Sequence, residues 1–297
     1  MLSIIIVNYN AKDFLFQCLK SIERADKPNS YEIIIVDNNS IDSSKIMIKK
    51  EFPDIKLIEN IENIGFAKAN NQGIKLSQGN YILLLNPDTV IYPNTLSRTI
   101  EFLNSNPKIG VVTCYVELAD GKIDPACHRG FPTPWASFCY FIGLEKLFPK
   151  SRILGGYHLG WLPLSTIHEI DTPSGCFYLV RREVIEQVGL LDESYFLFYE
   201  EVDWSYRIKQ AGWKIYYFPE VKITHYKGIS SGIKKNTSKL SRATKEIKRN
   251  AINSFCDSIK IFYDKHYKDK YPLIITWFIY LGVWIKRKIN LLRLAIS

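Results

Sequence analysis

Three short polar segments in the first hundred residues carry side chains that could hold a divalent cation and a phosphorylated ligand. They are Asn8-Tyr9-Asn10, Asp37-Asn38-Asn39-Ser40 and Asn86-Pro87-Asp88-Thr89. A carboxylate such as Asp88 can bind Mg²⁺ or Mn²⁺ together with substrate phosphates, and Asp37 can accept hydrogen bonds from a base or a ribose. Each segment alone could be an ordinary turn, because Asn, Asp and Ser are common turn formers. Three of them at one edge of a sheet favour a ligand site.

An acidic cluster in the second half of the chain could supply a general base. Glu200, Glu201 and Asp203 begin a predicted helix. The helix dipole stabilises acids at this position, so helix capping is the simpler interpretation. Three acids within four residues exceed what capping requires, and a carboxylate facing a crevice could take a proton from an acceptor hydroxyl. All three are therefore candidate catalytic residues.

Two further features concern phosphate and metal binding. Asn63-Ile64-Gly65 precedes a predicted helix that contains Asn70, and a glycine at a helix N-terminus suits a phosphate. The segment is neither a GxGxxG nor a Walker motif, so it indicates neither a dinucleotide nor ATP hydrolysis. His225 ends a short predicted strand, and it becomes a metal ligand only if it reaches Asp88.

An alternation of strands and helices must position these side chains. Apolar runs and helical spacing predict strands at 2–7, 31–36, 56–58 and 81–85, and helices at 14–22 and about 66–76. Strands that are apolar throughout fit a parallel sheet covered on both faces, and their alternation with helices indicates βαβ units. Ligands bind at the carboxyl ends of the strands in such sheets, which is where the three polar segments fall.

The remainder of the chain has a less regular pattern. We expect a helix from Pro93 to about Asn104, a strand at 109–114, and β-hairpins and loops over 115–170 that could form a lid. The elements expected after this are a strand at 174–180, helices at 182–187 and 201–210, short strands at 214–218 and 221–225, and a helical tail.

The net charge of +9 is concentrated at the C-terminal end. Residues 227–250 hold eight Lys or Arg and one Glu, and residues 251–297 hold eight Lys or Arg and three Asp, so the remaining body is mildly acidic. A uniformly basic nucleic-acid binder would not show this division, and we expect no nucleic-acid partner. The six cysteines form no CxxC pair, which favours reduced thiols over a zinc site or disulfides.

Taken together, the motifs resemble glycosyltransferase family 2, and in particular its bacterial rhamnosyltransferase-like branch. The matching segments are SIIIVNYN at 3–10, YEIIIVDNNSIDSS at 31–44, NIGFAKANNQGI at 63–74, YILLLNPDT at 81–89, SGCFYLVRREVIEQVGLLDESYFLFYEEVDWSYRI at 174–208 and GWKIYYFPEVKITH at 212–225. The resemblance implies an α/β fold of the GT-A type, which is a Rossmann-like, mostly parallel central sheet with flanking helices. It places this domain at 1–230, before a basic, helical C-terminal extension at 231–297.

The resemblance also implies a divalent cation, Mg²⁺ or Mn²⁺, and a nucleotide-sugar donor such as a dTDP- or UDP-sugar. Asp88 is implied as the metal-binding acid of a DxD-type motif in which Asn86 replaces the first Asp, and His225 as the metal-ligating histidine. The expected donor-binding residues are Asn8, Asn10, Asp37, Asn38, Asn63, Gly65, Asn70, Asn86 and Gly175.

The acidic cluster departs from the pattern of this branch, which reads Glu-Asp-x-Asp where this chain reads Glu200-Glu201-Val202-Asp203. Glu201 inherits the position of the base, with Glu200 and Asp203 as alternatives. We expect inverting transfer of a sugar, with rhamnose favoured, to a glycan or lipid-linked saccharide of the bacterial cell surface. In that mechanism Glu201 takes the proton of the acceptor hydroxyl while the cation neutralises the departing diphosphate.

The tail raises the question of a membrane. The uncharged stretch 271–285 would be about 22 Å long as a helix, which is short of a bilayer core of about 30 Å. Basic residues around it favour peripheral membrane contact through 227–297, since they attract anionic lipid. A helix buried on the body or in a homo-oligomer interface is the alternative. Because the N-terminus lacks the pattern of a secretory signal, we expect a cytoplasmic protein at the inner face of the plasma membrane.

Two other functions compete with sugar transfer. A sugar nucleotidyltransferase usually begins with a Gly-rich loop bearing Arg or Lys, and Asn8-Tyr9-Asn10 offers no such loop. A non-catalytic module that binds a nucleotide sugar would not need the acids at 200–203.

Overall fold

The computed structural model describes residues 1–26, 28, 30–232, 241 and 243–296. The strands of this part of the chain are β1 (Leu2–Asn8), β2 (Tyr31–Asp37), β3 (Lys56–Glu59), β4 (Tyr81–Leu85), β5 (Thr89–Ile91), β6 (Ile109–Leu118), β7 (His168–Ile170), β8 (Phe177–Arg181) and β9 (Lys214–His225). They form one sheet in the order β3-β2-β1-β4-β8-β6-β9-β5, and β7 pairs with β9 beside this path.

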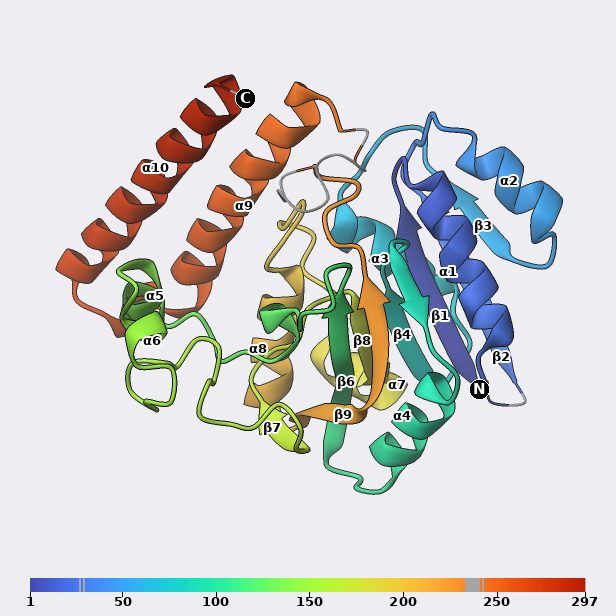
Figure 1. The fold of residues 1–297 in the computed structure, drawn as a ribbon, viewed down its shortest axis with the longest axis horizontal. Coiled ribbons are helices and arrows are strands. Elements are labelled where there is room, and N and C mark those ends of the chain that lie inside the picture. Colours follow the sequence, from blue (N-terminus) through green and yellow to red (C-terminus); the bar gives the residue numbers. More distant parts are fainter. Residues whose placement is uncertain (27, 29, 233–240, 242, 297) are drawn as a thin grey trace.

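Helices cover both faces of the sheet. They are α1 (Lys12–Arg24), α2 (Ser44–Glu51), α3 (Phe66–Leu76), α4 (Thr95–Asn104), α5 (Pro134–Phe141), α6 (Leu144–Leu147), α7 (Arg182–Val188), α8 (Glu200–Gln210), α9 (Lys245–His266) and α10 (Leu273–Ile296), with short 3₁₀ turns at Pro125–Cys127 and Lys268–Lys270. In Figure 1, α1 lies in front of the sheet while α3 and α7 lie behind it. The predicted α/β architecture with a helical tail is therefore confirmed.

Parallel pairing aligns the polar strand ends of the first half. β1 lies between β2 and β4 and runs parallel to both, with Asn8 opposite Asp37. Ile4, Ile5 and Ile6 of β1 are fully buried, as expected for a strand covered on both faces. The carboxyl ends of these strands meet at one edge, where Asn8 Nδ2 donates to Asp37 Oδ2 at 2.8 Å.

The second half of the sheet is mixed. β8 is antiparallel to both β4 and β6. β9 runs parallel to β6, and β5 returns antiparallel on the other side of β9 with Thr89 opposite His225. The two short strands expected at 214–218 and 221–225 are one continuous strand, β9, whose register with β6 shifts after Cys114. β5, which was not predicted, is three residues long.

The segment 115–170 differs from the expected β-hairpins and loops because it also contains helices. β6 extends to Leu118 and is followed by a single bridge between Glu117 and Ile123. Further along, Thr133 Oγ1 accepts a hydrogen bond from the backbone of Ala136, and proline occupies the first position of α5. Both features are standard helix starts, and they override the loop-like composition of the segment.

The tail packs against the body through a cluster of aromatic side chains. α8 and the segment before it meet α9 in the cluster Tyr195, Val202, Tyr206, Phe262, Tyr263 and Tyr267. α10 packs along α9, and the hydroxyl groups of Tyr263 and Thr276 lie 2.9 Å apart. No helix within the described ranges is long and apolar enough to span a membrane. In the basic stretch 227–250, residues 233–240 and 242 lie outside the described residues.

An ionic cluster reinforces the contact between α8 and α9. The Asp203 carboxylate is fully buried, and it accepts hydrogen bonds from Arg207 Nε at 2.8 Å and His266 Nε2 at 2.7 Å. Lys265 Nζ lies 2.8 Å from the same carboxylate. Burial alone would raise the pKa of Asp203, but the bonds from His266, Lys265 and Arg207 hold that pKa well below its ordinary value. The tail therefore depends on an ionised Asp203.

Replacing Asp203 with Asn should lower the free energy of unfolding by about 3 kcal/mol, because the buried partner of Arg207, Lys265 and His266 loses its charge. A carboxylate with a lowered folded-state pKa adds stability above the unfolded pKa of about 3.9, and this is lost as the pH falls through the folded value. The wild type should therefore lose more stability than Asp203→Asn below about pH 4, as measured by urea unfolding at several pH values. Glu220→Gln breaks an exposed pair with Arg98 and should cost under about 1 kcal/mol. Equal losses in both variants at pH 7 would contradict this role of Asp203.

Candidate active site

Strand pairing brings Asp88 to His225 although 136 positions separate them along the chain. Asn86, Pro87 and Asp88 form the short link between β4 and β5, and the pairing of Thr89 with His225 sets the register of β5 on β9. Asp88 Oδ1 consequently lies 3.2 Å from His225 Nε2, with the two side chains only 8% and 4% exposed. The condition set by the sequence, that His225 must reach Asp88, is met.

Two more side chains surround this pair. Asn86 Nδ2 lies 3.4 Å from His225 Nε2, while Asn86 Oδ1 is buried and makes no hydrogen bond within the described residues. Asp124 Oδ2 lies 3.8 Å from His225 Nδ1, and Asp124 accepts hydrogen bonds from Lys227 Nζ at 2.6 and 2.7 Å. Sequence reasoning missed Asp124, because it is an isolated acid in an irregular segment.

The electrostatic environment favours opposite charges on these groups. Burial lowers the pKa of His225, but the Cys176 sulfur and the Asp88 and Asp124 carboxylates outweigh it and raise that pKa well above its ordinary value. Burial raises the pKa of Asp88, but the attraction and the hydrogen bond of His225, together with backbone hydrogen bonds, outweigh it and lower that pKa. For His225 to be neutral, another positive charge, such as a metal ion, would have to lie beside Asp88 in place of the proton.

The donor atoms around Asp88 fit a divalent cation. The Asp88 carboxylate and an imidazole nitrogen lie 3.2 Å apart at the strand ends, and beside them is the Asn86 amide, whose oxygen makes no hydrogen bond within the described residues. Mg²⁺ and related ions bind through one or two carboxylates and fill their remaining positions with phosphate and water. Among the described residues no group of three His, Cys, Asp or Glu could hold a metal. A cation here would therefore depend on a phosphorylated ligand for part of its coordination.

A second wall of the site is built on a glycine turn. Asn38 Nδ2 donates to Asn63 Oδ1 at 3.0 Å and to the Gly65 carbonyl at 3.1 Å. Gly65 has φ +88°, and a Cβ at this position would lie 2.7 Å from the Phe196 carbonyl oxygen. The Phe66 amide donates to the same oxygen at 2.7 Å, which fixes the start of α3. Only glycine allows this close approach.

Four of the expected donor-binding residues support the site from behind and do not line its cavity. Asp37 accepts bonds from Asn8 Nδ2 and the Ser40 amide, both at 2.8 Å. Asn10 Oδ1 accepts from the Ile41 amide at 2.8 Å, and Asn70 Nδ2 donates to the Phe66 carbonyl at 2.9 Å. These side chains hold the loops that end β1 and β2 and the first turn of α3.

The acids of α8 occupy three different environments. Glu201 Oε1 accepts a hydrogen bond from Arg129 Nη2 at 2.9 Å. Glu200 is buried, and burial followed by repulsion from Glu201 raises its pKa well above its ordinary value, so the protonated form is favoured. Asp203 faces the tail and does not line the cavity. Phe198 and Tyr199 directly before this helix have φ of 72° and 69°, a strained conformation that recurs at functional sites.

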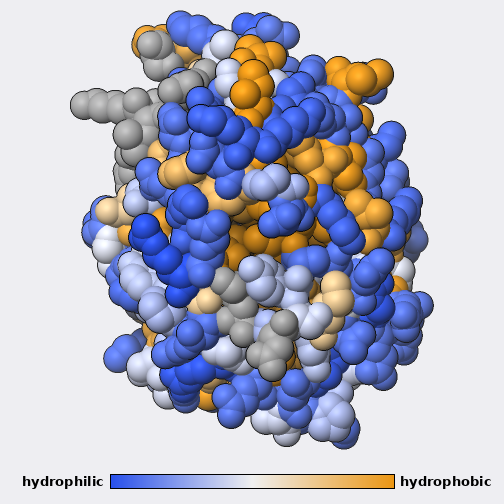
Figure 2. Space-filling model, turned by 90° about the vertical axis from the view of Figure 1, so that its right-hand side faces the viewer, coloured by the Kyte–Doolittle hydropathy of each residue, from blue (hydrophilic) through white to orange (hydrophobic). Residues whose placement is uncertain are grey.

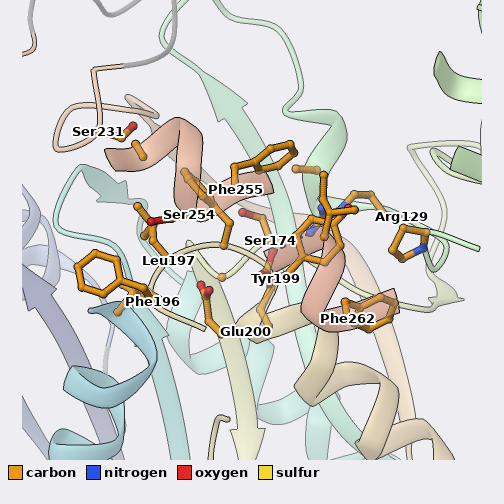
Figure 3. A pocket seen from close by; sticks show the side chains of 18 of the residues that line it. Arg129, Ser174, Phe196, Leu197, Tyr199, Glu200, Ser231, Ser254, Phe255 and Phe262 are labelled. Carbon is orange, nitrogen blue, oxygen red and sulfur yellow. Dashed lines mark hydrogen bonds and ion pairs between the residues drawn. The ribbon is translucent and has the colours of Figure 1, made fainter. Parts of the chain in front are cut away.

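One cavity of about 1260 Å³ connects these groups. Of the residues expected from the sequence, its wall includes Asn38, Asn63, Gly65, Asn86, Asp88, Gly175, Glu200, Glu201 and His225. In the close-up, Glu200 and Tyr199 lie in the same pocket as Arg129 and the aromatic rings of Phe255 and Phe262 (Figure 3). The sequence did not single out Arg129 or the aromatic wall, because neither forms part of a motif.

Comparisons with known proteins identify the family of the chain. The model of the family "Glycosyl transferase family 2" matches residues 3–158. An N-acetylglucosaminyl-diphospho-decaprenol L-rhamnosyltransferase of Mycobacterium tuberculosis is 26% identical over 78% of this chain and 78% of that protein. The rhamnosyltransferase WbbL of Escherichia coli is 24% identical over 76% of this chain and 83% of its own length.

Solved structures share the fold at low identity. The mannosyltransferase PcManGT from Pyrobaculum calidifontis, solved with GDP-Man and Mn²⁺, has a TM-score of 0.56 at 15% identity, over 98% of this chain and 86% of that one. TarS 1-349 from S. aureus has a TM-score of 0.55 at 15% identity, over 96% and 80%. The GT-A fold expected from the sequence is thus confirmed.

Proposed function

Since the chain belongs to glycosyltransferase family 2, we propose that it is an inverting, metal-dependent enzyme that moves a sugar from a nucleoside diphosphate to a saccharide acceptor. The observation that carries the proposal is the meeting of Asp88 and His225 in the same cavity as Glu201. The first pair suits the departing diphosphate and its cation, and Glu201 suits the incoming hydroxyl. The two rhamnosyltransferase relatives support rhamnose as the sugar and a bacterial surface polysaccharide as the product.

The donor would lie along the polar part of the cavity. Its nucleotide would contact Asn38, Asn63 and the backbone at Gly65, with a dTDP- or UDP-sugar as the donor class. Asp88, His225 and the Asn86 amide oxygen would hold Mg²⁺ or Mn²⁺, which supplies Lewis-acid stabilisation of the diphosphate charge. The buried Asn86 oxygen that lacks a hydrogen bond among the described residues supports this assignment.

Glu201 would act as the general base, with the acceptor hydroxyl attacking the anomeric carbon from the face opposite the nucleotide. The Glu201 carboxylate pairs with Arg129 Nη2 at 2.9 Å, which holds it in place at the cavity wall. Glu200 is the poorer candidate because burial and repulsion from Glu201 raise the pKa of its carboxyl and so favour the protonated form. Gly175 lines the cavity next to Glu201, where a Cβ would lie 3.7 Å from the Glu201 Cβ, so a larger residue would crowd the base.

The enzyme would work at the inner face of the plasma membrane on a lipid-linked or glycan acceptor. α5, α6 and α10 expose large apolar side chains, among them Phe141, Leu147, Leu273, Trp277 and Trp284. The centre of the Phe141 ring lies 4.4 Å from Lys286 Nζ, so α5 and α10 belong to one surface. On the side of α1 and α2, hydrophilic residues cover much of the surface and surround hydrophobic residues at the centre of the view (Figure 2). An amphipathic surface of this kind binds the membrane interface without crossing the bilayer.

Replacing Asp88 with Ala should abolish transfer and reduce donor binding in the presence of Mn²⁺ to the level seen with a chelator, because the cation loses its carboxylate. Isothermal titration with the nucleoside diphosphate, with and without Mn²⁺, measures the binding. Glu220→Gln is the matched control, since that carboxylate pairs with Arg98 at the surface and does not line the cavity, and it should keep the metal dependence. Near-normal turnover by Asp88→Ala would refute the assignment.

Glu201→Gln should lower kcat by about 10²–10⁴, the usual contribution of a general base. Glu200→Gln should stay within about tenfold of the wild type, since Gln resembles the protonated carboxyl that already occupies this position. Steady-state kinetics at saturating donor separates the two variants. A larger loss in Glu200→Gln would transfer the role of base to Glu200, and a product that retains the anomeric configuration would exclude the inverting mechanism.

The double substitution Trp277→Ser and Trp284→Ser should weaken binding to anionic vesicles at least tenfold, because two exposed indole rings leave the interface. Vesicle sedimentation at two salt concentrations measures this loss. Ile46→Ser on α2 removes a comparably exposed side chain from the hydrophilic side and should leave vesicle binding unchanged. Equal binding by all three proteins would argue against this membrane surface.

A further inference from the structure

One part of the cavity is lined by apolar side chains from three helices, and we call it the apolar arm. Its lining includes Phe138 of α5, Phe255 and Ile259 of α9, and Ile279 and Val283 of α10. The arm continues into the part of the cavity that contains Asp88 and Glu201. Family membership and the proposed donor leave it without an occupant.

The size and chemistry of the cavity call for a second, apolar ligand. Pockets for small molecules measure about 300–1,000 Å³, and this cavity has about 1260 Å³. A nucleoside diphosphate sugar is polar over most of its surface and carries two negative charges. Lys286 Nζ lies 4.8 Å from the centre of the Phe255 ring, but the side chains of Phe255, Ile259 and Val283 offer those charges no partner, so burying the charges among them is costly. The arm therefore suits a hydrocarbon chain.

α10 supports the same conclusion because it is apolar on two faces. Ile275, Ile279 and Val283 line the cavity, whereas Leu273, Ile274 and Trp277 are 81%, 64% and 74% exposed on other faces. A helix that is apolar on all sides is normally buried. The proposed membrane would cover the exposed face of α10 but not the face that lines the cavity. Water in the cavity would leave those apolar side chains hydrated, which is unfavourable. A lipid chain entering from the membrane would cover them.

A cation lies where the arm meets the catalytic groups. Arg129 is 9% exposed, lines the cavity and bonds to Glu201 through Nη2 at 2.9 Å. Its Nε atom is buried and has no hydrogen-bond partner within the described ranges. A buried guanidinium with a vacant donor suits a phosphate oxygen. A ligand with its chain in the arm would therefore bring a phosphate to Arg129, beside the proposed base.

We propose that the apolar arm binds the long hydrocarbon chain of a phosphate-linked saccharide acceptor and that Arg129 binds its phosphate. The proposal rests on the proposed function, because the acceptor sugar must then reach Glu201. It assigns a task to the C-terminal helices: α9 and α10 form the acceptor site together with α5. Recognition of the acceptor depends on its lipid as well as on its sugar.

Gly282 offers a direct test. It lines the cavity on α10, and a Cβ added there meets no atom within 4 Å. Gly282→Phe would therefore place a ring in the arm without a clash at its base, while Gly282→Ala adds only one methyl group. The probe is a prenyl diphosphate of three isoprene units that carries a terminal benzophenone, used with the full chain. Binding is measured by competition, and the crosslinked peptides are identified by mass spectrometry.

In the wild type the benzophenone should label α5, α9 or α10, and inorganic diphosphate should bind at least tenfold more weakly than the probe. Gly282→Phe should weaken the probe at least tenfold, and Gly282→Ala should weaken it less than threefold. Phe138→Ser, on a different helix, should also weaken the probe. Arg129→Lys should reduce binding of the diphosphate probe but leave binding of the matching prenyl alcohol unchanged.

Labelling confined to other parts of the chain, or equal probe affinity in Gly282→Phe and Gly282→Ala, would overturn the proposal. So would displacement of the probe by hexadecylphosphocholine with equal affinity, since the arm would then hold any membrane lipid. Measuring hydrolysis of the donor by the wild type tests the proposed function separately from binding of the hydrocarbon chain. Donor turnover without specific prenyl binding would refute this inference alone, whereas prenyl binding without any donor turnover would refute the proposed function alone.

Discussion

The antiparallel pairing of β5 with β9 is the constraint on which the site depends. It sets Thr89 opposite His225 and so brings the Asp88 carboxylate to the imidazole. β5 is only three residues long, and its register would be weakly specified in isolation. β9 fixes it, because β9 is also paired with β6 along most of its length, where Leu118 lies opposite His225. The geometry of the proposed metal site is therefore a property of the whole sheet.

The first half of the fold could be predicted from the sequence because its signals are local. Apolar runs such as 2–7 and 81–85 form strands wherever both faces of a sheet are covered, and parallel strand ends must meet at one edge. Asp88, Asn38 and Gly65 were placed in this way. The antiparallel insertion of β8 between β4 and β6 carries no local signal, since a buried strand looks the same in either direction.

What could not be predicted depends on contacts between distant segments. Asp124 and Arg129 belong to no motif, and they matter because β6 and the loop after it end beside β9 and α8. The helix α5 was missed because PWASFCYF is apolar on nearly every side, which conceals a helical period, although Thr133 and Pro134 give a regular helix start. The helical tail was expected, but its place beside the cavity follows from tertiary packing.

The three acids of α8 lie in different environments, and one of them, Asp203, connects the helix to the C-terminal tail. Asp203 is surrounded by Arg207, Lys265 and His266 and must be ionised for α9 to stay in place. Glu201 points into the cavity and shares its charge with Arg129, while Glu200 is buried next to that charge and is favoured in the neutral form. A second ionised acid at 200 would repel Glu201 and compete for the same guanidinium. The helix therefore turns Glu201 to the cavity, keeps Glu200 buried beside it and binds Asp203 to the tail, so the proposed base lies on the same helix that meets the wall provided by α9.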